Sequence, residues 1–308
     1  MIRRFSLMTL CAAASVASVL APAAKAQLWT WTKDQMVEYT KAWTGDRFPD
    51  GRPKVPDEWL DRAKDISQEE INVPGASGRG GGGYSQYEGD WRVLHPEMKM
   101  TGRAFTMAFM PARADLDQVV MAKAKEKGIQ NLNNQYVFDM LQPGDVLVVD
   151  LYGKKEGGTV VGDNLFYYIM KATRSGGLVV DGSLRDLDGI APIPMPCYYR
   201  AVHPSWITGV TLSAVNVPVR IGNVTVMPGD LVVGDREGVS FIPAQNAETI
   251  LDRADETHIH DEWTRKKFDE LKYKSSEIYG SPRDAALKQE YQEYLKKRLE
   301  EIKAGRNK

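Results

Sequence analysis

The stretch GDNLFYYIMKATRSGGLVVDGSLRD, residues 162–186, carries the clearest fold signal in this chain. Its segment Leu165–Arg174 has the length and apolar spacing of a helix, and the glycines Gly176 and Gly177 follow it. The apolar run Leu178–Asp181 then predicts a buried strand that leads into a turn. A helix followed directly by a buried strand is typical of a mixed α/β domain.

Further strand signals lie on both sides of this stretch, between Lys99 and Pro243. Most are short apolar runs bounded by Gly, Asp or Pro, and a second helix is expected over Leu116–Lys127. The other expected strands are Gly102–Phe109, Val146–Asp150, Cys197–Val202, Thr211–Val219, Leu231–Asp235 and Val239–Pro243. We therefore expect one α/β domain over residues 67–245.

The regions on either side of this domain differ from it in composition. Residues 27–66 are rich in Trp, Asp, Lys and Pro, and they predict an arm with short helices at Lys33–Trp43 and Asp57–Asp65. Residues 246–308 are charged and helical, and Pro282 divides them in two. Helical extensions of this kind pack on their own domain or on a neighbouring subunit.

The first 26 residues have the features of a bacterial secretory signal peptide. Arg3 and Arg4 precede the apolar stretch Phe5–Ala21, and Ala24 and Ala26 are small residues before a cleavage point after Ala26. The protein is therefore expected to be periplasmic or secreted, with a retained membrane anchor as the alternative. No later segment approaches the ~18 apolar residues of a membrane span, so no stable membrane insertion is expected after cleavage.

Charge and cysteine content narrow the possible partners. The chain has 40 basic and 41 acidic side chains, and cleavage removes Arg3, Arg4 and Lys25 but no acidic residue. The mature net charge is then −4, from 37 basic and 41 acidic groups. No basic excess is present to bind a phosphate backbone, so nucleic acid is not an expected partner. Only Cys197 remains after cleavage, which excludes an internal disulfide.

Residues suited to binding an anion and a cation flank the predicted strand. The planar guanidinium of Arg185 suits a carboxylate or carbonyl oxygen, and Asp186 supplies the hard oxygen that Mg²⁺ or Mn²⁺ prefers. The backbone N–H groups of Asn164 and Leu165 lie at a predicted helix start, where anions bind. The pattern favours an oxo-acid site with a divalent cation; the alternative is a structural Arg–Asp pair.

The runs GDVLVVD (144–150), GDNL (162–165), GGLVVDGSLRD (176–186) and VNVPVRIGNVTVMPGDLVVGDREGVSFIP (215–243) occur together in this chain. In this combination the chain resembles the family that includes 4-hydroxy-4-methyl-2-oxoglutarate aldolase and the regulator of ribonuclease E activity. The resemblance implies a swivelling β/β/α domain, assembled as a homotrimer or hexamer with sites between subunits. It also implies a divalent-metal-dependent lyase with a small-molecule oxo-acid substrate.

The resemblance also implies roles for individual residues. In the family's aldolases an Asp, twenty residues and then an Arg-Asp pair form the active site. Arg185 matches the arginine that holds the oxo-acid and stabilises its enolate, and Asp186 matches the metal-binding Asp. Asp163 would orient metal-bound water, but it lies one residue too far from Arg185. Strict counting selects Asn164 instead; we favour Asp163 because it follows Gly162.

The implied reaction is carbon–carbon cleavage through a metal-stabilised enolate, of the aldolase or oxaloacetate decarboxylase type. The expected protein is thus an exported lyase for a small oxo-acid or hydroxy-carbonyl compound. Export separates it from the cytoplasmic catabolites on which such aldolases act, so the substrate stays open. The alternative from a different class is a non-catalytic binding or regulatory member of the same family.

Several other residues have candidate roles. The pair His258 and His260 has a spacing seen among metal ligands, but residues two apart do not share a helix face. His203 lies near a predicted sheet end and is a candidate pocket residue or a structural histidine. Cys197 is expected to be a buried thiol. The N-terminal tryptophans are candidates for ligand stacking or for anchors in a subunit interface. The run Gly80–Gly83 lacks the features of a phosphate-binding loop.

Overall fold

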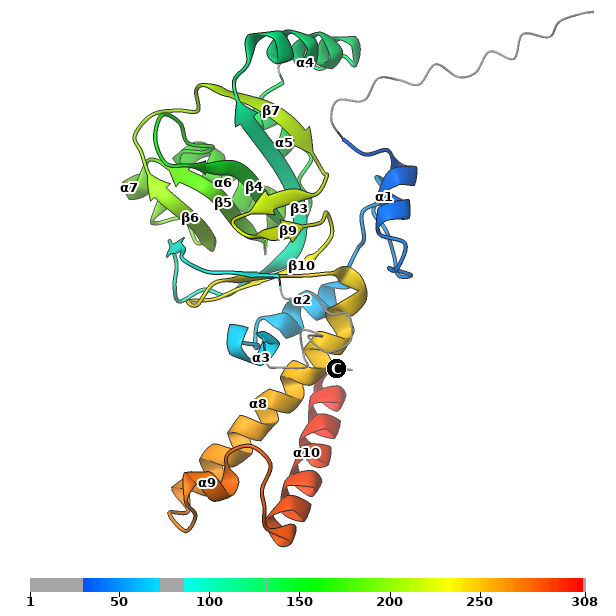
Figure 1. The fold of residues 1–308 in the computed structure, drawn as a ribbon, viewed down its shortest axis with the longest axis vertical. Coiled ribbons are helices and arrows are strands. Elements are labelled where there is room, and N and C mark those ends of the chain that lie inside the picture. The colour runs from blue at the N-terminus through cyan, green and yellow to red at the C-terminus, as the bar shows by residue number, and fades with distance from the viewer. Residues whose placement is uncertain (1–29, 73–85, 131, 175, 307–308) are drawn as a thin grey trace, which may run out of the picture.

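The computed structural model describes residues 30–72, 86–130, 132–174 and 176–306. The expected signal peptide, Cys11 and the Gly80–Gly83 run lie outside these residues. A mixed sheet forms the centre of the molecule, and a pair of long helices extends away from it (Figure 1). Within the described residues, no helix combines the length and apolarity required to cross a bilayer.

The central sheet contains four neighbouring parallel strands. Strands β3, β4, β5 and β6 lie side by side in this order and pair in parallel. The strands around them pair antiparallel, and the path through the sheet is β1-β11-β10-β3-β4-β5-β6-β2, with β7 also on β3. The bounds are β1 (Tyr87–Glu88), β2 (Arg92–Val93), β3 (Met100–Pro111), β4 (Asp145–Lys154), β5 (Gly177–Leu184), β6 (Cys197–Val202), β7 (Val210–Val215), β10 (Leu231–Gly234) and β11 (Val239–Ile242).

Elements cover both faces of the parallel strands, which explains their continuous apolar runs. Side chains of α4 (Ala114–Glu126), α5 (Asn134–Phe138), α6 (Asp163–Thr173) and α7 (Leu187–Ile190) share one core with the sheet. The hairpin of β8 (Val219–Ile221) and β9 (Val224–Val226) packs into a second core. Consecutive residues of β4 therefore alternate between two cores, and both sets are fully buried.

The two extensions pack on each other and on the sheet. Helices α2 (Asp57–Ala63) and α3 (Gln68–Asn72) contact α8 (Ala247–Asp269), and their apolar side chains form a third core with β10 and β11. The remaining elements are α1 (Lys33–Tyr39), a short 3-10 turn (Ala244–Asn246), α9 (Ser275–Ile278) and α10 (Ala285–Arg306). Helices α8 and α10 run side by side away from the sheet (Figure 1).

Three tryptophans of the N-terminal arm, Trp31, Trp43 and Trp59, pack within this chain, and Trp29 lies outside the described residues. Trp43 is buried in the third core, and its ring meets that of Trp59 edge to face at 6.1 Å between centroids. The Trp43 Nε1–H donates to the Asp46 carbonyl at 2.8 Å. Trp31 stacks on Tyr39 within the same arm. Trp43 and Trp59 therefore anchor the arm to its own chain, whereas the sequence suggested a ligand or a subunit interface.

A buried ion pair holds the arm against the parallel strands. The Arg52 guanidinium donates to both carboxylate oxygens of Asp145, at 2.6 and 3.2 Å, and both side chains are fully buried. The Arg52 guanidinium also lies over the rings of Phe48 and Phe105, at 4.2 and 5.0 Å. The arm thus reaches the first residue of β4.

Most of the predicted elements are confirmed, with shifted ends. The expected strand Thr211–Val219 is wrong as one unit, because Asn216 adopts a left-handed conformation (φ 56°) and the chain turns between β7 and β8. The segment from Ser67 to His95 contains α3, β1 and β2, which the sequence pattern did not predict. These elements are two to five residues long, too short to produce a periodic pattern.

Candidate functional site

The candidate site lies where α6 begins and β5 ends. Gly162 immediately precedes α6, and its carbonyl accepts the first helical hydrogen bond, from Phe166 N at 2.9 Å. Arg185 and Asp186 directly follow β5. Because β4 and β5 are parallel neighbours, the segments that leave their carboxyl ends emerge at one edge of the sheet. The fold therefore brings together the two ends of the 162–186 stretch.

Gly162 packs directly against the Arg185–Asp186 pair. A Cβ atom at position 162 would lie 2.2 Å from Asp186 Oδ2 and 3.0 Å from both Nε and Nη2 of Arg185. The separation from Asp186 Oδ2 is shorter than real Cβ contacts and the two from Arg185 are tight, so a side chain at position 162 would require the Asp186 carboxylate to shift. The absent side chain is what allows the start of α6 to approach the two charged groups.

Asp186 is held in an unusual backbone conformation. Its φ of 57° and ψ of 40° lie in the left-handed region, which Asp tolerates better than most residues. Its carbonyl accepts from the N–H groups of Gly189 and Ile190, both at 2.9 Å, and so begins α7. The turn leaves 41% of the Asp186 side chain exposed, so the carboxylate is open to solvent.

Arg185 has unused hydrogen-bonding capacity. Its Nε lies 3.6 Å from Asp186 Oδ2, which is an ion-pair distance rather than a hydrogen bond. That Nε–H group is buried and has no hydrogen-bond partner among the described residues. A buried donor without an acceptor is costly, and a ligand oxygen would satisfy it.

Asp163 and Asn164 differ in their surroundings. A Cβ on Gly189 would lie 2.9 Å from Asp163 Cβ and 3.1 Å from its Oδ2, so Asp163 packs against α7 beside the Arg185–Asp186 turn. The Asn164 side chain is exposed. The Asn164 N–H, expected to bind substrate with that of Leu165, already donates to Asp163 Oδ1 at 2.7 Å. A ligand anion would therefore compete with the Asp163 carboxylate for this N–H.

The residues at this site fit a hydrated divalent cation. The Asp186 carboxylate is open to solvent, and Asp163, the first residue of α6, packs against α7, which begins directly after Asp186. Mg²⁺ commonly keeps several waters and uses only one or two protein carboxylates. No group of three or more His, Cys, Asp or Glu side chains is poised for a metal in the described part of the chain. A divalent cation at this site would therefore have one or two carboxylate ligands and water at its remaining coordination positions.

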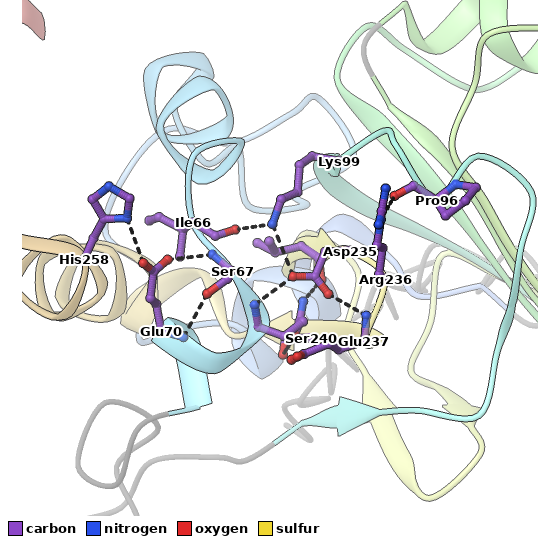
Figure 2. Close-up of polar contacts among 12 residues, drawn as sticks. Ile66, Ser67, Glu70, Pro96, Lys99, Asp235, Arg236, Glu237, Ser240 and His258 are labelled. Carbon is purple, nitrogen blue, oxygen red and sulfur yellow. Dashed lines mark hydrogen bonds and ion pairs between the residues drawn. The ribbon is translucent and has the colours of Figure 1, made fainter. Parts of the chain in front are cut away.

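His258 of α8 belongs to a separate polar cluster (Figure 2). His258 Nδ1 lies 2.7 Å from Oε1 of the buried Glu70, whose Oε2 accepts from Ser67 N at 2.7 Å. His260 Nε2 contacts the Gly280 carbonyl at 2.7 Å. A hollow of about 580 Å³ opens beside His258, but Arg185 and Asp186 do not line it. The two histidines thus face different partners and do not form a shared metal site.

The same cluster anchors the turn after β10. Asp235 accepts from the N–H groups of Gln68 and Glu237, at 3.0 and 2.8 Å, and pairs with Lys99 at 3.2 Å (Figure 2). Lys99 also donates to the Ile66 carbonyl at 3.0 Å. These contacts join α3 to the sheet, so Asp235 of the PGDLVVGD run stabilises the fold.

Of the remaining candidate residues, Cys197 is buried away from solvent, whereas His203 lies beside the site. Cys197 is fully buried on β6, and burial raises the pKa of its thiol well above the usual value, which disfavours a reactive thiolate. His203 lies next to the site, because its N–H donates to the carbonyl of Leu184, the residue before Arg185, at 2.9 Å. Its Nδ1 contacts Ser205 Oγ at 2.8 Å.

Sequence analysis did not identify Gly189 as part of this site. Its missing side chain allows α7 to pack on Asp163, as Gly162 allows α6 to pack on Asp186. Both glycines lie within four residues of a charged candidate, which is the only local signal. Gly162 packs on Asp186 and Gly189 packs on Asp163 because of the way α6 and α7 meet in the fold, which the sequence alone does not show.

Comparison with known families agrees with the fold. The family model described as RraA-like (Aldolase/RraA) matches residues 72–240, just over half of the 308 residues. The chain therefore belongs to the RraA-like family, and the α/β class expected from the sequence is confirmed.

Individual relatives match parts of the chain. A Halalkalibacterium halodurans protein provisionally named 4-hydroxy-4-methyl-2-oxoglutarate aldolase is 32% identical over 120 residues, or 39% of this chain and 56% of that protein. A protein of the same provisional name from Azotobacter vinelandii is 38% identical over 102 residues, or 32% of this chain and 60% of that protein. The chain thus spans little more than half the length of these curated relatives.

One solved structure matches over nearly its whole length. Streptomyces coelicolor RraAS2, described as an unusual member of the RNase ES inhibitor RraA protein family, superposes with a TM-score of 0.56 and 28% identity. The match covers 70% of this chain and 98% of that chain. The family thus contains members named for a lyase activity and members named for ribonuclease inhibition.

Proposed function

We propose that this protein is an exported, divalent-metal-dependent lyase that cleaves a small oxo-acid or hydroxy-carbonyl compound through an enolate. The observation that carries the proposal is the convergence of Arg185, Asp186 and Asp163 around the missing side chains of Gly162 and Gly189. The aldolase-named relatives support the same reaction class.

Arg185 would bind the acid end of the substrate. Its buried, unpartnered Nε–H is a donor for a substrate carboxylate or 2-oxo oxygen. The same donor stabilises the negative charge that develops on that oxygen when the C3–C4 bond of a 4-hydroxy-2-oxo acid breaks. The 4-hydroxyl proton passes to a water that Asp163 would orient, the products are a carbonyl compound and the enolate of pyruvate, and protonation of the enolate at C3 gives pyruvate.

Asp186 is the residue that would hold the cation, Mg²⁺ or Mn²⁺, and Asp163 would orient a water beside it. A bound divalent cation would supply Lewis-acid stabilisation of charge on the substrate oxygens. Asp163 is favoured over Asn164 because it packs against α7 next to Asp186, whereas Asn164 is exposed. The additional residue between Asp163 and Arg185 can be accommodated after α6, where Arg174 has a φ of 59°.

We also propose a periplasmic or secreted location and assembly as a homotrimer or hexamer. The signal-like first 26 residues support export. Exposed apolar side chains on and near α4 and α6 support the proposed assembly, because burying apolar surface between subunits is favourable. They are Met110, Val119, Met121, Tyr167 and Tyr168.

The test is an assay of the mature chain, residues 27–308, after treatment with a chelator. Pyruvate release is measured from 4-hydroxy-4-methyl-2-oxoglutarate and from oxaloacetate, each without metal, with Mg²⁺ and with Mn²⁺. We expect metal-dependent pyruvate release from at least one substrate, and Arg185→Ala should abolish it. Folded protein that binds Mg²⁺ but releases no pyruvate from either compound would contradict the pyruvate-lyase assignment.

A non-catalytic regulatory role is the second candidate. It is favoured by the match to nearly the whole of RraAS2, a structure described within an RNase inhibitor family. Export would separate the protein from an intracellular ribonuclease. Absence of turnover, combined with inhibition of a purified ribonuclease E, would favour the regulatory role over the lyase.

A further inference from the structure

Trp206 presents a large apolar ring to solvent near the Arg185–Asp186 site. It lies between β6 and β7, and 70% of its surface is exposed. Trp43 and Trp263 are both buried in the fold, so exposure is not the rule for tryptophan in this chain. An indole held in water has apolar area available to a ligand.

The backbone around Trp206 is braced on both sides. Thr159 Oγ1 donates to the Ser205 carbonyl and Thr208 Oγ1 donates to the Gly157 carbonyl, each at 3.0 Å. Thr159 and Trp206 also form a parallel β-bridge. The segment after β4 and the segment after β6 therefore hold each other, and Trp206 is mounted on an ordered support.

Two chain connections place Trp206 close to the site. His203 N donates to Leu184 O, the residue before Arg185, and Trp206 follows three residues later. Thr159, the bridge partner of Trp206, lies three residues before Gly162. Three residues span at most ~10 Å, and paired strands lie ~5 Å apart. The Trp206 backbone is therefore within roughly 15 Å of Gly162.

We propose that Trp206 is a specificity-determining residue that stacks on an aromatic ring at the far end of the substrate. The inference rests on the proposed function, in which Arg185 and Asp186 hold the oxo-acid end. A substrate that carries a ring beyond its 2-oxo acid group would span the two. Stacking of one aromatic pair corresponds to roughly a three- to tenfold gain in affinity.

Binding of two probes that differ by one ring tests this inference. The dissociation constants of pyruvate and phenylpyruvate are measured by titration calorimetry with Mg²⁺ present, together with tryptophan fluorescence. The variants are Trp206→Ala, Trp206→Phe and the control Tyr279→Ala, an aromatic side chain of the same 70% exposure on the C-terminal extension.

We expect wild type to bind phenylpyruvate about tenfold more tightly than pyruvate. Trp206→Ala should remove this preference without weakening pyruvate, Trp206→Phe should keep most of it, and Tyr279→Ala should change neither value. An equal preference in wild type and Trp206→Ala, or no preference in wild type, would overturn the specificity role alone. If neither probe binds wild type, the oxo-acid site itself fails and the inference fails with it.

Light scattering of the same variants distinguishes ligand stacking from the alternative that Trp206 is a subunit contact. If Trp206→Ala changes the number of subunits while Tyr279→Ala does not, Trp206 is a subunit contact and the ligand-stacking role is wrong. An unchanged oligomer together with a lost ring preference supports stacking on the ligand.

Discussion

Gly162 and Asp186 lie in direct contact, and the contact depends on the absence of a side chain at position 162. A methyl group there would lie 2.2 Å from Asp186 Oδ2. We expect Gly162→Ala to displace Asp186 and Arg185 and to abolish pyruvate release while circular dichroism stays native. Gly305→Ala is the matched control, because a Cβ at position 305 meets no atom within 4 Å. Full activity of Gly162→Ala would mean that the pair is not the reaction centre.

Asp186 is expected to be the cation-binding residue of the site. Asp186→Asn removes the charge with little change of shape, so Mg²⁺ binding by calorimetry should be lost and turnover should fall by about a hundredfold or more. Asp188→Asn, an exposed carboxylate two residues away, should leave both unchanged. Equal metal affinity in the two variants would contradict the assignment.

Asp163 and Asn164 can be separated by paired substitutions. Asp163→Asn should reduce turnover strongly, because this carboxylate packs against α7 next to Asp186. Asn164→Ala removes an exposed side chain and should have little effect on turnover. The comparison is made from initial rates at saturating Mg²⁺. The reverse order of effects would place Asn164 at the first-carboxylate position of the family and weaken the lyase proposal.

The buried Arg52–Asp145 pair is expected to be essential for stability. Asp145→Ala leaves the fully buried Arg52 guanidinium with only the Asp50 carboxylate, 3.8 Å from its Nε, as a counter-charge, and removing one partner of a buried pair costs about 3–5 kcal/mol of unfolding free energy. The exposed pair Arg113–Asp115 is the control, and Asp115→Ala should change the free energy of unfolding little, because water screens this pair. Urea denaturation measures both. Similar losses in the two variants would show that the arm is not held by this pair.

Asp230 makes the stability depend on pH. Burial raises the pKa of its carboxyl from 3.8 to about 7, and the hydrogen bond from the Met227 N–H, at 2.8 Å, opposes this shift only in part. Between these two values the folded chain keeps a proton that the unfolded chain releases. The stabilisation is therefore complete below about pH 4 and is lost as the pH rises through about 7.

Asp230→Asn keeps the shape and the acceptor oxygen but cannot ionise. Wild type should lose at most about 1.4 kcal/mol of unfolding free energy per pH unit across this range through Asp230, and the variant should lack this component. Urea denaturation at pH 5, 6, 7 and 8 measures the difference. Parallel curves for wild type and variant would contradict the raised pKa.

Local sequence patterns were sufficient to predict the longer helices and strands of the α/β domain. The apolar runs at 146–149 and 178–180 predict buried strands because each residue type and its neighbours already favour that state, and the structure confirms β4 and β5. The helix before β5 was also predicted, although it begins two residues earlier, at Asp163. The short elements α3, β1 and β2 depend on tertiary pairing and left no periodic signal.

The chain itself, without any fold, determined that Arg185 and Asp186 follow a buried strand, because a turn after an apolar run is a local property. It left Asp163 and Asn164 as alternatives, with Asp163 favoured because it follows Gly162, and one residue on a helix rotates a side chain by about 100°. Tertiary packing places Gly189 of α7 against Asp163 and leaves Asn164 exposed, a difference that only the fold shows. Packing likewise brought Gly162 against Asp186 and the loop of Trp206 beside them, because those contacts join chain segments that only the parallel strand order makes neighbours.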